Sequence, residues 1–388
     1  MPTSMAAAPA ASASGGQTAY GAAVLVRGTE SCIGEQATAS SPDPIGVSHV
    51  RDFRLTCAMR FNDPRVSGNK SGPMSMDGWG PASAPDAIVE WTSSRLIENE
   101  GGAWVGRLAG VYTTETGDML SAWFEGTGGY AGLSFFEWVT APVGAATTGY
   151  PVVGLIFPGG SPTLPDLGPM PSPARAAIPP SLPPVPSSAP VAYGTGAGTA
   201  YFVRGMEICE SGAITIPSPD PDGVVRVRDA SLPCIVAFND PRVSGTNTGP
   251  WNADAWGGAT GAIVEWGSPR RIENAGGAWV GSLSGVHTTE TGDMLSAWFE
   301  GTGGYAGLSF FEWIACPQGT ATSACPVVGL IYPGSIPRPE SLTGRNGRDR
   351  PWPSVVRESH LPRIPVSTLR TRFATNASGA RRLGESKS

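Results

Sequence analysis

The sequence has no long apolar segment and few of the residues on which common catalytic motifs depend. Its most continuous apolar segment, Val152 to Phe157, is short and is interrupted by Gly154, whereas a spanning helix needs about 20 apolar residues. We therefore expect no membrane span. No P-loop, Rossmann fingerprint, Ser-His-Asp order or paired-cysteine redox motif occurs, so nucleotide chemistry, nucleophilic hydrolysis and disulfide exchange lack a sequence signal.

The first residues also lack the features of a secretory signal. The segment MPTSMAAAPAASASGG has neither a basic n-region nor a Leu/Val-rich h-region. Residues 1–17 are therefore expected to form a flexible Ala/Ser leader.

Charge is scarce as well, at 15% of residues, while Gly (53), Pro (38) and Trp (12) are abundant. This mixture suits short strands joined by many turns better than long helices, so it favours an all-β fold. The formal net charge is -6, but residues 338–388 hold 11 Lys/Arg against 4 Asp/Glu. Because these basic residues lack interleaved aromatics, we expect a solvated, disordered tail and no nucleic-acid partner.

One long segment occurs twice. Residues 101–138 recur as residues 276–313 with three differences in 38 positions, and FNDPRVSG at 61–68 recurs at 238–245. A unit of about 140 residues is too long for a solenoid or propeller repeat, so this is a domain duplication. We predict two β-barrel domains, 18–160 and 196–337.

Residues 161–195, between the two copies, are rich in proline. Such a composition favours an extended, semi-rigid spacer, which is a disordered linker without a core of its own. We expect the two domains to sit apart without a fixed interface.

The cysteines follow the duplication. Cys32 and Cys57 of the first copy match Cys209 and Cys234 of the second, whereas Cys316 and Cys325 both lack a counterpart. Thiols that appear or vanish together indicate bonded partners. The predicted disulfides are Cys32–Cys57, Cys209–Cys234 and Cys316–Cys325.

Disulfides imply an oxidising compartment, so we expect an extracellular or cell-surface protein despite the missing signal. The alternative is a cytoplasmic protein with buried, reduced thiols. The three histidines, His49, His287 and His360, do not recur between the copies, and no short-spaced ligand set is present. We therefore expect no metal and no cofactor.

The repeated segment reads as consecutive hairpins. Ala87–Ile97 is followed by turn residues, and further strands are expected over Ala103–Thr113, Asp118–Glu125, Tyr130–Ala141 and Val152–Phe157. Period two over Ala103–Thr113 places Trp104 and Leu108 on the inner face and Arg107 and Ala109 on an outer, solvent face. Eight such strands would close an antiparallel meander into a barrel.

The segment with Trp-x-Gly-x-x-x-Gly at 104–110 and GTGGYAGL at 126–133 resembles the last strands of the allene oxide cyclase barrel-like superfamily, which is related in shape to dirigent proteins. Together with DPRVSG, ENEGGAW and LIFPG, the pattern looks like uncharacterised bacterial members of that superfamily. The likeness covers about residues 20–160 and 197–335. It implies an eight-stranded barrel with an apolar cavity, in which the plant enzymes cyclise a fatty-acid epoxide without a cofactor.

Polar residues present in both copies are the candidates for a site. Asn62 to Arg65 read first as a turn in which Arg65 pairs with a carboxylate, with a ligand role as the alternative. Glu125 would be an acid or base at a cavity mouth if Trp123 faces inward; otherwise it lies on the solvent side. The other retained polar residues are Glu90, Arg95, Glu98, Asn99 and Glu137, with Glu265, Arg270, Glu273, Asn274 and Glu312 in the second copy.

The aromatic residues would line a cavity if the barrels are hollow, and would form a packed core otherwise. We expect a protein that binds a small apolar ligand or serves as a structural or adhesive module. The alternative is a cofactor-independent isomerase or cyclase acting on a lipid-like epoxide. The predicted ligand-binding residues are Trp91, Glu98, Trp104, Trp123, Glu125 and Tyr130, with Trp266, Glu273, Trp279, Trp298, Glu300 and Tyr305.

Overall fold

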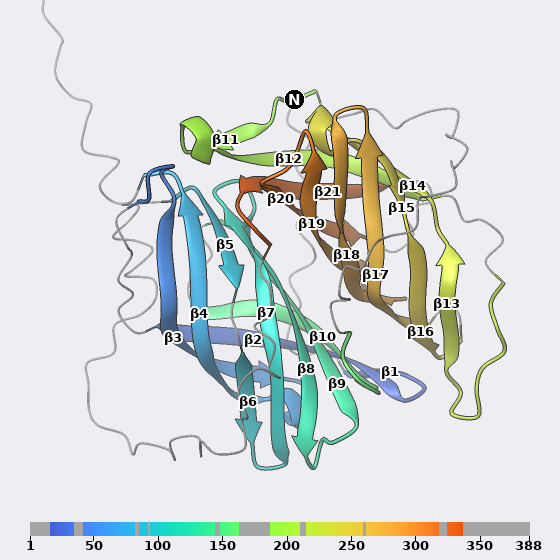
Figure 1. Ribbon diagram of the computed structural model, residues 1–388. Coiled ribbons are helices and arrows are strands. Elements are labelled where there is room, and N and C mark those ends of the chain that lie inside the picture. The colour runs from blue at the N-terminus through green and yellow to red at the C-terminus, as the bar shows by residue number, and fades with distance from the viewer. Residues whose placement is uncertain are drawn as a thin grey trace, which may run out of the picture.

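The computed structural model describes residues 16–34, 42–81, 85–91, 94–143, 148–162, 187–209, 215–258, 261–317 and 324–336. These residues form two closed, antiparallel β-barrels, so the predicted fold class is confirmed (Figure 1). The predicted leader (1–17) and linker (161–195) lie mostly outside the described residues, which include only 16–17, 161–162 and 187–195 of them, and the predicted tail (338–388) lies wholly outside. None of the helices in the described ranges has the length and apolar character needed to span a membrane.

Barrel 1 has eight strand positions, arranged in chain order around the ring, with β2 pairing both β3 and β10 to close it. Strands β5 and β6 share one position, since both pair with β4 and β7. The expected meander is therefore present. Its elements are β1 (Thr18–Tyr20), β2 (Ala23–Gly34), β3 (Ser48–Phe61), the 3-10 helix η1 (Pro64–Val66), β4 (Gly68–Trp79), β5 (Ala87–Trp91), β6 (Arg95–Asn99), β7 (Gly102–Thr113), β8 (Gly117–Gly128), β9 (Leu133–Ala141) and β10 (Thr148–Pro158).

Barrel 2 repeats this topology, with β12 pairing both β14 and β21 to close the ring. Its first strand, β11, lies within the predicted linker, so the domain begins earlier than the predicted residue 196. Its elements are β11 (Val191–Tyr193), the 3-10 helix η2 (Gly196–Gly198), β12 (Ala200–Cys209), β13 (Val225–Ser231), β14 (Cys234–Phe238), the 3-10 helix η3 (Pro241–Val243), β15 (Gly245–Thr248), β16 (Pro250–Trp256), β17 (Ala262–Asn274), β18 (Gly277–Thr288), β19 (Gly292–Gly303), β20 (Leu308–Cys316) and β21 (Cys325–Pro333).

The period-two pattern of β7 explains how the barrel interior is filled. Trp104 and Leu108 are buried inside barrel 1, as predicted from their shared face. A Cβ atom at Gly106, between them, would collide with the carbonyl oxygen of Trp123 on β8. Glycine is therefore required where β7 and β8 approach most closely.

Besides a small cluster of Val225, Val227 and Ala255 in barrel 2, three large apolar clusters result from this alternation. One lies inside barrel 1 around Trp104, and a second lies inside barrel 2 around Trp279. The third lies between the barrels and includes Trp138 and Trp313, whose rings stack with centroids 3.5 Å apart. The expectation of separate domains is therefore wrong: the outer faces of both barrels carry aromatic side chains, which are buried against each other.

The interface is built from reciprocal contacts. Phe157 packs against Trp256, and the matching residues Trp79 and Tyr332 pack against each other on the opposite side. Arg204 pairs with Glu115 at 2.8 Å, and the matching Arg27 pairs with Glu290. Equivalent residues also meet directly, since the hydroxyl groups of Ser121 and Ser296 lie 3.1 Å apart. The two barrels thus meet as the subunits of a two-fold dimer do.

This interface also corrects the assignment of the outer face of β7. Solvent was expected there, but Val111 is fully buried and Ala109 is partly buried against the shared cluster. Ser282 and Ser284 of barrel 2, which take the places of Arg107 and Ala109, are buried as well. The sequence differences at these positions therefore lie on a face that is buried, not on a solvent face.

Candidate functional site

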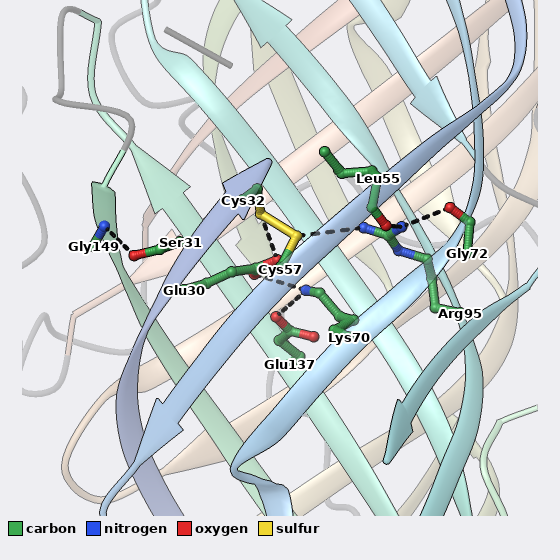
Figure 2. Close-up of a disulfide and its surroundings, with 10 residues drawn as sticks. All are labelled: Glu30, Ser31, Cys32, Leu55, Cys57, Lys70, Gly72, Arg95, Glu137 and Gly149. Carbon is green, nitrogen blue, oxygen red and sulfur yellow. Dashed lines mark hydrogen bonds and ion pairs between the residues drawn. A yellow bond between two sulfur atoms is a disulfide. The ribbon is translucent and has the colours of Figure 1, made fainter. Parts of the chain in front are cut away.

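The middle of barrel 1 holds a group of buried, charged side chains. Glu30 on β2, Lys70 on β4, Arg95 on β6 and Glu137 on β9 are each at most 4% exposed. Figure 2 shows the two carboxylates pointing toward the lysine from different strands. Strand alternation puts them inside, because Glu137 shares its face with the buried Phe135.

Lys70 joins the two glutamates. Its Nζ donates hydrogen bonds to Oε2 of Glu30 and to Oε1 of Glu137, both at 2.7 Å. A buried charge is costly unless it is paired, and here one ammonium group is shared by two carboxylates. Lys70 is therefore the residue that allows both glutamates to lie inside barrel 1.

The two carboxyl groups differ in their pKa. Burial raises the pKa of Glu137 to about 7, and the charge of Glu30 adds to the rise while Lys70 opposes it. Burial acts on Glu30 in the same way, but the charge and hydrogen bonds of Lys70 outweigh it and lower the pKa of Glu30. Glu30 is therefore ionised at neutral pH, and Glu137 holds a proton for part of the time.

Arg95 connects this group to the first disulfide (Figure 2). Its Nη1 donates to the carbonyl oxygens of Leu55 and Gly72 at 3.2 Å, and Nη2 lies 3.9 Å from Sγ of Cys57. Oε1 of Glu30 lies 3.0 Å from Sγ of Cys32, the other half of the bridge. The disulfide therefore borders the polar middle of the barrel.

Barrel 2 has the same glutamates and arginine but lacks the lysine. Asn247 occupies the position of Lys70, with the same register against the cysteine strand. Its Nδ2 donates to Oε1 of Glu207 at 2.9 Å, whereas its Oδ1 has no hydrogen-bond partner among the described residues. Glu312, the counterpart of Glu137, is fully buried, and both of its oxygens likewise lack a partner there.

The pKa values in barrel 2 reflect this difference. Burial, together with the charge of Glu207, raises the pKa of Glu312 well above its usual range. Burial also raises the pKa of Glu265 to about 7 and raises that of Glu207, although Arg270 opposes both. The charge of Arg270 opposes the rise at all three carboxyl groups, including Glu312.

Two partly exposed side chains lie at one end of barrel 2. His287 on β18 and Asp293 on β19 lie near Glu265, and their side chains are 28% and 30% exposed. Nδ1 of His287 lies 2.8 Å from Oδ1 of Asp293, and this hydrogen bond raises the pKa of His287. Tyr112 and Asp118 take these positions in barrel 1.

The three predicted disulfides, Cys32–Cys57, Cys209–Cys234 and Cys316–Cys325, are all present, with no free cysteine. A carboxylate lies beside each bridge, from Glu30, Glu207 and Asp293 respectively. Thiolates, not disulfides, are the sulfur ligands of metals, so these groups could hold an ion only after reduction.

The turn at Asn62–Arg65 is confirmed. Oδ1 of Asp63 accepts a hydrogen bond from the backbone N–H of Arg65, which starts η1. The Arg65 guanidinium pairs with the same carboxylate at 2.6 Å. A ligand role for these residues stays a prediction.

The predicted ligand-binding aromatics occupy two different places. Trp104 stacks on Tyr130 inside barrel 1, with ring centroids 5.1 Å apart, and Trp279 stacks on Tyr305 in the same way in barrel 2. These pairs form a packed end of each barrel interior. Trp91, Trp123, Trp266 and Trp298 lie on the other face of their strands and pack in the cluster between the barrels.

The predicted glutamates do not lie beside the buried aromatic residues. Trp123 faces the other barrel, so the inward direction on which an acid-base role for Glu125 depended is wrong. Strand alternation explains the error, since Phe124 and not Trp123 is the inward residue. Glu98, Glu125 and Glu273 are exposed, and Glu300 is half-buried.

The sequence analysis did not identify four of the buried polar residues inside the two barrels: Glu30, Lys70, Glu207 and Asn247. Two signals could have found them. Glu precedes the first cysteine by two positions in both copies, and lysine occurs at only two positions in the chain, one of which is replaced by Asn in the second copy.

Comparisons of the chain with protein-family models, with curated proteins and with solved structures found no match. The resemblance to the allene oxide cyclase superfamily therefore stays a prediction.

Proposed function

We propose that this protein is an extracytoplasmic binding protein in which barrel 2 takes up a small molecule with an apolar body and a polar end. The observation that carries the proposal is Glu312, a fully buried carboxyl group whose two oxygens have no partner among the described residues. Buried polar groups in proteins are almost always hydrogen-bonded, so such a group needs an explanation.

The surroundings of Glu312 support a ligand with mixed character. Ile314, which shares a face of β20 with Glu312, belongs to the apolar cluster inside barrel 2 together with Leu283 and Val327. Small-molecule sites typically combine an apolar lining with a few polar groups that fix the orientation of the ligand. The half-buried His287 and Asp293 mark the end from which a small molecule would enter.

The proposed location outside the cytoplasm depends on the disulfides. All six cysteines are paired, and such bridges persist in oxidising compartments. Mass spectrometry of the native protein without reductant should find three bridges and no free thiol. Free thiols in native material would count against export.

Binding can be tested with straight-chain alcohols from butanol to octanol by isothermal titration calorimetry. If the ligand body lies in an apolar interior, affinity should rise about threefold to fourfold for each added methylene. Ala297, which pairs with Glu312 across β19 and β20, offers a blocking variant, Ala297→Leu. The matched control is Ala122→Leu in barrel 1, beside Glu137.

Loss of binding in Ala297→Leu but not in Ala122→Leu is the expected result. Equal binding by both variants, or no dependence on chain length, would contradict a site inside barrel 2. Circular dichroism should confirm that both variants are folded.

A second candidate function is the isomerisation or cyclisation of a lipid-like epoxide. The observation that favours it is the full burial of Glu312, because burial favours the protonated form of a carboxyl group, and that form can donate a proton to an epoxide oxygen. Turnover of an epoxide by the full chain, lost in Glu312→Gln, would support an enzyme. Binding without turnover would support the binding protein alone.

A further inference from the structure

The two barrels differ at one position in the polar middle of their interiors, and the difference is one of charge. Barrel 1 has Lys70 and barrel 2 has Asn247, while the neighbouring glutamates and the arginine are the same. The duplication therefore provides an internal comparison between a barrel with an ammonium group and one without.

In barrel 1 the glutamates act as ligands of an ammonium group. Glu30 and Glu137 each accept a hydrogen bond of 2.7 Å from Lys70 Nζ, and both are almost fully buried. The matching carboxyl groups of barrel 2, Glu207 and Glu312, lie on strands with the same pairing, β12 and β20.

Asn247 cannot replace the ammonium group. It is shorter than lysine, carries no charge and donates a hydrogen bond to Glu207 alone. Its Oδ1 and both oxygens of Glu312 are acceptors without a donor among the described residues. A primary ammonium group offers three N–H donors and one positive charge, which is what this set of acceptors lacks.

We propose that barrel 2 binds the primary ammonium group of a small organic amine between Glu207 and Glu312, where barrel 1 holds the ammonium group of Lys70. This inference rests on the proposed binding function and specifies the polar end of the ligand. Barrel 1 supplies the cation from its own chain and has no such site.

Calorimetry of the full chain with n-butylammonium chloride tests the proposal. The wild type should bind one ion per chain, at least about tenfold more tightly than n-butanol, since charge-assisted hydrogen bonds are roughly twice as strong as neutral ones. Asn247→Lys should lose this site. Lys70→Asn should gain a second site in barrel 1.

Equal affinity for n-butylammonium in the wild type and in folded Asn247→Lys would overturn the inference, as would the absence of a second site in folded Lys70→Asn. If Asn247→Lys does not fold, Glu312→Gln is the deciding variant, because it removes one hydrogen-bond acceptor. It should weaken the binding of n-butylammonium at least about tenfold and leave the binding of n-butanol nearly unchanged.

Failure of this inference can be told apart from failure of the proposed function. If n-butanol binds inside barrel 2 and n-butylammonium binds no more tightly, only the ammonium site is wrong. If neither compound binds, the proposed function fails with it.

Discussion

Barrel 1 and barrel 2 have the same fold, but their buried carboxyl groups have different hydrogen-bond partners. Barrel 1 places Lys70 between two glutamates, so its charges are compensated within the chain. Barrel 2 has Asn247 instead, and burial raises the pKa of its Glu312 well above the usual range because no lysine opposes it there. The comparison shows that a single residue decides whether each of the two inner carboxyl groups has a cation as its hydrogen-bond partner: Glu137 has Lys70, whereas neither oxygen of Glu312 has a partner among the described residues.

The largest loss of stability is expected at a pair of equivalent residues in the interface between the barrels. Trp138 and Trp313 are equivalent and stack on each other, so Trp138→Ala and Trp313→Ala should each lower the free energy of unfolding by about 3–5 kcal/mol. The double variant should lose less free energy of unfolding than the sum of the two single losses, because both single variants remove the same ring contact. Urea unfolding measures this, and clearly unequal single effects would show that the interface is not symmetric.

The next largest loss of stability should differ between equivalent positions of the two barrels. Lys70→Met leaves Glu30 and Glu137 without their shared cation, and we expect a loss of about 3 kcal/mol, limited by protonation of Glu137. Asn247→Met removes one hydrogen bond to Glu207 and should cost about 1–2 kcal/mol. Similar losses in urea unfolding would contradict the different roles of the two positions.

The pH dependence of stability should differ in sign between Glu312 of barrel 2 and Glu30 of barrel 1. A carboxyl group with a raised folded pKa stabilises below its unfolded value near 4.5, and that contribution is lost as the pH rises through the folded value. Glu312→Gln should therefore be more stable than the wild type at pH 8, with a smaller difference at pH 4.5.

Glu30→Gln is the matched control. The lowered pKa of Glu30 stabilises the fold above pH 4.5, and this contribution is lost as the pH falls through the folded value. The substitution should therefore reduce stability at pH 8. Thermal melts at both pH values measure each variant, and an unchanged pH profile in Glu312→Gln would show that Glu312 does not titrate as described.

The smallest effect concerns the reciprocal ion pairs at the interface. Arg204 and Glu115 are partly exposed, so Glu115→Gln should cost about 0–1 kcal/mol, with the difference reduced by salt. Glu290→Gln, at the equivalent pair with Arg27, should behave in the same way.

Much of the fold was predictable from the sequence because it depends on local patterns. Period two over Ala103–Thr113 identified the inward residues of β7, and the co-occurrence of cysteines between the copies identified every disulfide. The closed meander followed from the regular spacing of turns. These features need no knowledge of contacts between distant segments.

The site and the interface were not predictable in this way. The polar group joins residues from β2, β4, β6 and β9, which only barrel closure brings together. The direction of Trp123 was misjudged because both faces of its strand are apolar, one toward the interior and one toward the other barrel. Composition alone could not show that the Pro-rich segment joins two barrels in contact.

The contacts of Ser121 with Ser296 and of Trp138 with Trp313 link each residue to its own counterpart. Such pairing is the geometry of a homodimer whose two protomers have been joined end to end. A homodimer encoded by one short gene must carry every substitution twice, on both sides of its axis. Fusion removes that constraint, so one half can specialise while the other keeps the assembly stable.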